Sequence, residues 1–315
     1  MTSRSKNKVV IVGTGFVGST IAYSLMLSEF VSEIVLIDVN TKKALGEAMD
    51  MNHGLPYVKQ MVIRTGSYED CADADAVVIT AGVNRKPGQS RLDLAKVNIG
   101  ILKDIMDGVK KYITNAVLLI VSNPVDILTY AAYKFTGLPR TQVFGTGTAL
   151  DTARFKYLIS QKLDVDVTNV HAYIIGEHGD SEVPVWSRAN IAGRRFDELC
   201  AECSIADIQA EKNEILENVR HAGAHIIEMK GATYYGIAMA VKRILGAVLF
   251  NERSILTVSS VMNGQYGVND VAVSLPSIVG ADGIERIFDI GLDEEEEKLF
   301  RESAEKLKEV LNQAI

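Results

Sequence analysis

The chain has 315 residues, of which 47% are hydrophobic and 23% are charged. These fractions are those of ordinary globular proteins, so disordered, collagen-like and low-complexity architectures are excluded, and the length suggests about two domains. The 33 basic and 40 acidic residues give a net charge of −7. A nucleic-acid-binding protein needs a clustered basic surface, so we expect no nucleic-acid partner.

The three cysteines, Cys71, Cys200 and Cys203, are too few for a disulfide framework and predict a reducing, cytoplasmic location. Cys200 and Cys203 form a CxxC pair without a second pair or a histidine at ligand spacing, so we expect an incidental pair on a surface helix and no metal. Glycines interrupt the apolar run near the N-terminus, and no apolar stretch reaches about 18 residues, so we expect neither a signal peptide nor a membrane partner.

The first half of the chain alternates short apolar runs with amphipathic stretches. The runs are continuous, which is typical of strands buried on both faces of a parallel sheet. They occupy residues 9–13, 33–38, 76–80 and 116–122. The helix-like stretches between them include residues 19–27, 42–52 and 92–111. This alternation predicts a doubly wound, Rossmann-type parallel α/β domain over residues 1–145.

The second half has a different pattern and predicts an α+β catalytic domain with an antiparallel sheet over residues 146–315. Helical patterns occur at 152–162, 205–229 and 232–249, and strand-like runs at 170–176, 254–262 and 270–280. Glycine and asparagine interrupt the last two runs, as expected for antiparallel strands. A final helix follows the acidic run 293–297, which suits the positive end of a helix dipole.

Gly13, Gly15 and Gly18 form a GxGxxG motif between an apolar run and a helical segment. In that context the glycines permit a tight turn, a close approach of backbone to a pyrophosphate, and packing of helix on strand. Asp38 ends the second apolar run, about 20 residues further on, where a carboxylate binds ribose hydroxyls and repels a 2′-phosphate. The motif therefore predicts a dinucleotide-binding domain with NAD as the cofactor.

Three further segments carry polar groups that suit catalysis. Arg85 and Arg91 lie in the glycine- and proline-containing loop 82–91, Asp151 and Arg154 share a helix face, and His178 lies in a turn directly after a strand. Taken singly, each has an ordinary explanation: a solvated loop, a helix ion pair and a loop histidine. The residues alone leave both interpretations open.

Several long motifs occur in order: GTGFVGS, VSNPVDILTY, GTALDTARF, HAYIIGEHGDSEVPVWS and KGATYYGIAMA. Through them nearly the whole chain resembles the lactate/malate dehydrogenase family. The resemblance implies reversible hydride transfer between NAD and a small 2-oxo or 2-hydroxy acid. It also implies a homo-oligomer, usually a tetramer.

The same resemblance assigns roles to residues. His178 would be the general acid and base, Asp151 would orient its imidazole, and Arg154 would bind the substrate carboxylate through two parallel hydrogen bonds. Arg91 would stabilise the developing oxyanion. Further substrate contacts would come from Asn123, Thr233 and Ile237. Cofactor contacts would come from Gly13, Gly15, Phe16, Val17, Gly18, Asp38, Thr80, Gly82, Ser122 and Asn123. The bond between Asn123 and Pro124 would be cis, as in the family.

Arg85 departs from the lactate pattern of this family, because lactate enzymes carry Gln there and malate enzymes carry Arg. An unpaired, desolvated Arg over pyruvate would cost roughly 2–5 kcal/mol. The motif around His178 and the residue Thr233 nevertheless resemble the lactate branch. We therefore expect reduction of pyruvate, with malate dehydrogenase as the alternative and a non-catalytic NAD-binding protein as a remote one.

Lys156 and His171 occupy the positions that bind an activating fructose 1,6-bisphosphate in many bacterial members of the family. The family uses Arg where this chain has Lys156, and Lys keeps the charge but not the bidentate geometry. We therefore expect weak or absent activation. Otherwise His171 would be an ordinary histidine at the edge of the core.

Overall fold

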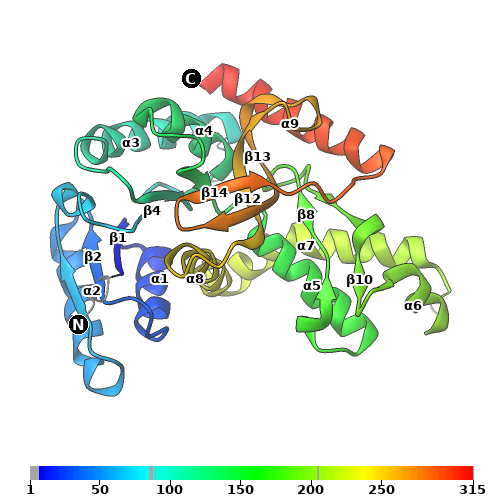
Figure 1. Cartoon of the computed structure of the whole chain (residues 1–315), viewed down its shortest axis with the longest axis horizontal. Helices are drawn as coiled ribbons and strands as arrows, with labels where there is room; N and C mark the ends of the chain where they lie inside the picture. Colours follow the sequence, from blue (N-terminus) through cyan, green and yellow to red (C-terminus); the bar gives the residue numbers. More distant parts are fainter. Residues whose placement is uncertain (1–6, 85–87, 89, 204–205, 315) are drawn as a thin grey trace.

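Nine strands form one continuous sheet in the computed structural model, which describes residues 7–84, 88, 90–203 and 206–314 (Figure 1). The strand order is β14-β13-β12-β6-β5-β4-β1-β2-β3. The parallel strands are β1 (Lys8–Val12), β2 (Glu33–Ile37), β3 (Val62–Thr65), β4 (Ala76–Ile79), β5 (Val117–Ile120) and β6 (Val143–Gly145). The antiparallel strands are β12 (Ser254–Asn263), β13 (Asn269–Gly280) and β14 (Gly283–Ile287).

Helices cover both faces of the sheet. One core contains Val10 and Val12 of β1, and a second core contains Val9 and Ile11, because side chains alternate between the two faces of a strand. Helices α3 (Arg91–Val109), α4 (Val125–Thr136) and α9 (Glu294–Ala314) line the first core. Helices α1 (Phe16–Met26), α2 (Thr41–His53) and α8 (Tyr235–Leu249) line the second. Each such Val or Ile contributes about 1.5–3 kcal/mol by its burial.

The antiparallel strands of the second half continue the parallel sheet. β12 pairs with β13 and meets β6 at Ser259 and Gly145. This pairing covers the backbone groups that the outer edge of β6 would otherwise expose. The predicted order, a Rossmann-type sheet followed by a part with antiparallel strands, is confirmed, although the largest antiparallel unit does not form a separate sheet.

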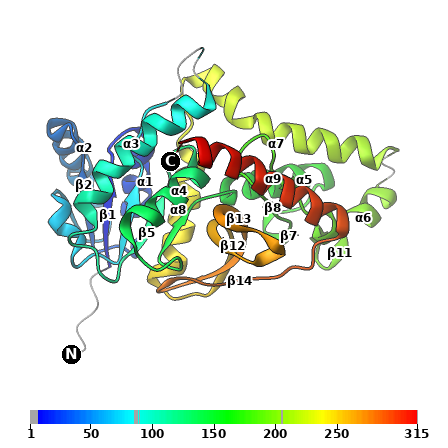
Figure 2. The ribbon, with the colours of Figure 1, turned by 90° about the horizontal axis from the view of Figure 1, so that it is seen from above.

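A third core lies beyond the sheet, between α5 (Ala149–Leu163), α6 (Phe196–Glu202) and α7 (Ile208–Lys230) (Figure 2). Two small sheets complete this part of the fold. They comprise β7 (Val170–His171), β10 (Asn190–Ile191) and β11 (Arg194–Arg195), and β8 (Ile174–Ile175) with β9 (Val183–Pro184). Within the described ranges, none of the helices is both long and apolar enough to cross a bilayer.

Candidate active site

The glycine turn joins β1 to α1 and leaves a backbone cradle. Gly13 has φ +103°, and a Cβ there would lie 2.6 Å from Ala81 N. A Cβ on Gly18 would lie 1.9 Å from Gly13 O, so helix and turn pack too closely for a side chain. By contrast, within the described ranges no atom beyond the chain neighbours of Gly15 lies within 4 Å of a Cβ position on it, and no described side chain caps the first amides of α1 there. The open backbone and uncapped amides fit a pyrophosphate.

Asp38 follows β2 and lies beside this turn. Its Oδ2 accepts hydrogen bonds from Thr14 N at 2.6 Å and Thr14 Oγ1 at 2.9 Å, and its Oδ1 accepts from Asn40 N at 2.8 Å. Burial raises the pKa of Asp38, but the hydrogen bonds from Thr14 and Asn40 outweigh burial and lower it. The carboxylate retains acceptor capacity for a hydroxyl, which fits an adenosine ribose.

The other predicted cofactor residues surround the same edge of the sheet. Thr80 Oγ1 donates to Gly13 O at 2.8 Å, and Ser122 Oγ donates to Ala81 O at 2.6 Å. These two hydroxyls therefore hold the loops together. Gly82 is exposed, and Val17 packs partly buried against the second core. Phe16 is 70% exposed and stacks on Tyr234, with 5.5 Å between ring centroids.

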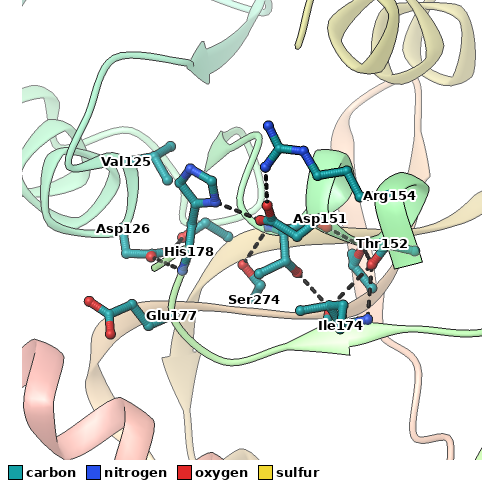
Figure 3. Close-up of polar contacts among 12 residues, drawn as sticks. Val125, Asp126, Asp151, Thr152, Arg154, Ile174, Glu177, His178 and Ser274 are labelled. Carbon is teal, nitrogen blue, oxygen red and sulfur yellow. Dashed lines mark hydrogen bonds and ion pairs between the residues drawn. The ribbon is translucent and has the colours of Figure 1, made fainter. Parts of the chain in front are cut away.

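The side chains of His178 and Arg154 both contact the carboxylate of Asp151 (Figure 3). His178 follows β8 in a tight turn, and its Nδ1 lies 2.6 Å from Asp151 Oδ2. Arg154 Nη1 donates to Asp151 Oδ1 at 2.9 Å, from one turn further along α5. Asp151 is buried, and its negative charge is compensated from both sides.

The electrostatics of the pair favour an imidazolium. The carboxylate of Asp151 raises the pKa of His178 to about 9, against the opposing effect of burial. Burial alone would raise the pKa of Asp151, but His178 and Arg154 outweigh it and lower that pKa. Reduction of a carbonyl needs a group that can donate a proton at neutral pH, and a protonated histidine is such a group.

The sequence did not indicate Asp126, which fixes the backbone of the turn. Asp126 Oδ2 accepts from His178 N at 2.8 Å, and its Oδ1 accepts from Ser259 Oγ at 2.6 Å. Burial raises the pKa of this carboxyl despite both hydrogen bonds. Asp126 lies in α4, just after the turn that carries Asn123, so it connects the two turns.

Arg91 begins α3 and forms an ion pair with Glu177, the residue before His178. The side chains of Glu177 and His178 leave the turn in different directions (Figure 3). Glu177 N donates to Ser303 Oγ of α9 at 2.9 Å. The predicted oxyanion-stabilising cation is thus held next to the turn of His178. Arg85 lies outside the described residues.

Asn123 is exposed at the end of the turn after β5, and its bond to Pro124 is cis, as the resemblance implies. Thr233 and Ile237 are both partly buried, Thr233 between α7 and α8 and Ile237 in α8. A residue that the sequence analysis missed, Asn98 of α3, donates from Nδ2 to Asn123 O at 2.7 Å.

Glu182 is a second residue that the sequence did not indicate. It is 3% exposed, and its Oε1 lacks a hydrogen-bond partner among the described residues. Burial, reinforced by the negative charge of Asp151, raises the pKa of Glu182 to about 8. Arg220 of α7 donates from Nη2 to the backbone oxygen of Glu182 at 3.1 Å. Burial therefore favours the protonated form of Glu182.

Lys156 and His171 are the two residues at the expected phosphate-binding positions. Lys156 of α5 is partly buried, which lowers the pKa of its ammonium, and its Nζ lies 5.9 Å from the centre of the Tyr173 ring. His171 of β7 pairs with Asn190 in the small sheet and is exposed. The expectation of a histidine at the core edge is wrong, because the outward face of this short strand is open to solvent.

The cysteines are all free: Cys71 and Cys200 are buried and Cys203 is exposed. Burial raises the pKa of Cys200 to about 11, so its thiol stays protonated. In the part of the chain that the structure describes, no group of three or more His, Cys, Asp or Glu side chains could hold a metal ion.

A glycine turn with a nearby carboxylate at the carboxyl edge of a parallel sheet, together with a His and an Arg that both contact one buried Asp, defines a dinucleotide-dependent dehydrogenase. Family models match residues 7–145 as the lactate/malate dehydrogenase NAD binding domain and residues 148–315 as the lactate/malate dehydrogenase alpha/beta C-terminal domain. The chain belongs to the lactate/malate dehydrogenase family.

Individual relatives are similar over almost the full length. The L-lactate dehydrogenase of Acetivibrio thermocellus is 55% identical over 96% of this chain and 96% of its own. L-lactate dehydrogenase 1 of Clostridium acetobutylicum is 50% identical over 98% of this chain and 99% of its own. Among solved structures, the minor L-lactate dehydrogenase from Enterococcus mundtii in its ligands-bound form has a TM-score of 0.95 at 44% identity, and covers 99% of both chains.

Proposed function

We propose that the chain catalyses the reversible, NAD-dependent reduction of pyruvate to L-lactate. The observation that carries the proposal is the contact of His178 and Arg154 with one buried carboxylate, Asp151. This arrangement supplies a proton donor and a guanidinium within reach of one small molecule. The names of the three similar proteins above support pyruvate and lactate as the substrates.

When bound, NADH supplies the hydride. The Nδ1–H of His178 donates to Asp151, which leaves Nε2 to hold the proton that the carbonyl oxygen receives. Arg154 has five N–H donors and uses Nη1 on Asp151, so the remaining face of its guanidinium can bind the substrate carboxylate. We expect Arg91 to exchange Glu177 for the carbonyl oxygen as its charge develops.

The two halves would divide these tasks. Residues 1–145 would bind the dinucleotide, with Gly13, Gly15 and Gly18 at the pyrophosphate and Asp38 at the ribose. Phe16, Val17, Thr80, Gly82, Ser122 and Asn123 would complete that site. Residues 146–315 would supply the acid–base pair and the carboxylate-binding guanidinium. Asn123, Thr233 and Ile237 would line the substrate pocket, together with Arg85 from the loop.

We propose a homo-oligomer, specifically a tetramer, because of the resemblance to the family, and exposed apolar side chains are consistent with contacts between subunits. Large apolar side chains are exposed on two helices of the same sheet face: Leu45 and Met49 on α2, and Tyr235 and Met239 on α8. Such exposure is typical of a protein–protein interface. Light scattering after gel filtration gives the subunit number. Three free cysteines are consistent with the reducing cytoplasm as the proposed location.

The test of the function is loss of the nicotinamide absorbance when protein is mixed with NADH and pyruvate. We expect turnover by the wild type and a fall of about 10²–10⁴-fold in kcat for His178→Asn, because the proton donor is removed. NADH fluorescence titration reports cofactor binding separately. Binding of NADH without turnover of any small 2-oxo acid would support the non-catalytic alternative.

A further inference from the structure

One buried amide connects three segments of the site. Asn98 of α3 is 2% exposed. Its Oδ1 accepts from Val83 N at 2.9 Å, and its Nδ2 donates to Val83 O at 3.1 Å and to Asn123 O at 2.7 Å. Both amide hydrogens are used. If the side-chain amide of Asn98 were turned by 180°, its NH₂ group would face the Val83 N–H, and two donors would oppose each other. The contacts therefore define the orientation of the amide.

The position of Asn98 relates the two ends of a loop. Val83 follows β4 and enters the loop 84–90, and α3 begins at Arg91 where that loop ends. Arg91 and Asn98 are separated by about two turns of α3, so they lie on the same side of the helix. The hydrogen bonds of Asn98 therefore connect Val83, at the start of the loop, to α3, the helix that carries Arg91.

The third hydrogen bond reaches the neighbouring strand. Asn123 O belongs to the peptide group before Pro124, in the turn after β5. A bond to this oxygen fixes the orientation of the peptide unit and thereby the direction of the Asn123 side chain. Three segments at the carboxyl edge of the sheet thus take their relative placement from one side chain.

We propose that Asn98 is a positioning residue for the reaction, which sets the placement of Arg91 and Asn123 relative to each other without contacting substrate or cofactor. The inference rests on the proposed function, because it assigns those two residues to the substrate. Both would act on a carbonyl whose orientation matters, and a displacement of about 1 Å from the reactive geometry can reduce a rate by up to about 10²-fold.

The chain offers a matched control with the same chemistry elsewhere. Gln142 is 9% exposed, and its Nε2 donates to Thr114 O at 2.9 Å and to Ala116 O at 2.6 Å. It lies just before β6, at the amino edge of the sheet, whereas Asn98 serves the carboxyl edge. Loss of its two donors disturbs the fold to a comparable extent but leaves the site untouched.

The experiment compares Asn98→Asp with Gln142→Glu. Each change replaces an NH₂ group with oxygen at nearly constant volume and removes the donors of two backbone carbonyls. We expect both variants to lower Tm. Only Asn98→Asp should lower kcat for pyruvate reduction, by about 10- to 100-fold. Its KM for NADH should change by a smaller factor than kcat, because the glycine turn and Asp38, which hold the pyrophosphate and the ribose, are unaffected.

Equal kcat values for the two variants, measured below both Tm values, would overturn the proposal. If either variant does not fold, Asn98→Ser and Gln142→Ser provide the same comparison with smaller side chains and no new charge. A pH profile adds a second readout. The carboxyl of Asn98→Asp regains one donor when protonated, so part of the lost kcat should return as the pH is lowered. Turnover by the wild type tests the proposed function independently of this contrast.

Discussion

Asp151 Oδ2 lies 2.6 Å from His178 Nδ1, although 27 positions separate the two residues in the chain. The carboxylate is buried, and a buried charge is stable only when it is paired and hydrogen-bonded. Asp151 meets this condition through His178 and Arg154. The pair therefore fixes the tautomer of the imidazole and also keeps a proton on it.

Asp151→Asn removes this charge while keeping the shape. We expect kcat/KM for pyruvate to fall by about 10²–10⁴-fold, because the imidazole no longer holds its proton at neutral pH. Steady-state assays at pH 7 measure the change. Asp166→Asn is the control, because Asp166 caps a short helix at an exposed site where Asn caps equally well. Retention of activity within tenfold by Asp151→Asn would contradict the assigned role.

The pKa of His178 predicts opposite pH profiles for the two directions. Asp151 raises that pKa to about 9, so kcat/KM for pyruvate should be constant near neutrality and fall as the pH rises through about 9. Oxidation of lactate needs the neutral imidazole and should rise over the same interval. An inflection below pH 7 in the free enzyme would disagree with this prediction.

The raised pKa of His178 also makes the free energy of unfolding depend on pH. The folded pKa lies above the unfolded value of about 6.5, so the contribution of His178 is complete below pH 6.5 and is lost as the pH rises through about 9. Urea unfolding of the wild type and of His178→Asn should give stability differences that shrink over that interval. A difference that grows with pH would contradict the assignment.

Arg85→Gln tests the choice between substrates. We expect the wild type to prefer pyruvate to oxaloacetate, and the variant to lose at least tenfold in kcat/KM for oxaloacetate because its second carboxylate loses a guanidinium partner. Arg140→Gln, an exposed cation just before β6, serves as the control. A wild type that prefers oxaloacetate and a variant that prefers pyruvate would establish the malate alternative.

Glu182→Gln should stabilise the protein in a pH-dependent way. The folded pKa of Glu182, about 8, lies above that of an unfolded glutamate, so folding keeps a proton that the unfolded chain releases. The raised pKa of Glu182 therefore lowers the free energy of unfolding by an amount that grows as the pH rises from about 4.5 to 8. The gain in Tm of the variant should therefore be larger at pH 8 than at pH 5. Glu302→Gln, at an exposed site, should show no such trend.

Fructose 1,6-bisphosphate should leave KM for pyruvate within about twofold, because Lys156 lacks the bidentate geometry and is partly buried. Lys156→Arg restores the guanidinium that the family uses at this position and should gain a response. Initial rates with and without the bisphosphate measure both. A large drop in the wild-type KM would show that the single ammonium suffices.

The sequence patterns predicted the long buried strands well, because continuous apolar runs are informative over five residues or more. β6 has three residues and β3 contains Arg64, so neither produced a readable pattern. Asp126 could not be recognised, since its partner His178 lies 52 positions away. Asn98 did leave a signal: it interrupts the apolar face formed by Leu94, Ala95 and Leu102 in α3. A polar residue on such a face marks a specific partner.

The hydrogen bond from Glu177 N to Ser303 also has a consequence for biosynthesis. The turn that carries His178 gains this support from a helix translated more than a hundred codons later. A nascent chain that has not yet released α9 from the ribosome lacks both Ser303 and the apolar contacts of Phe300. We therefore expect the turn of His178 to reach its final placement only after α9 has been translated and packed.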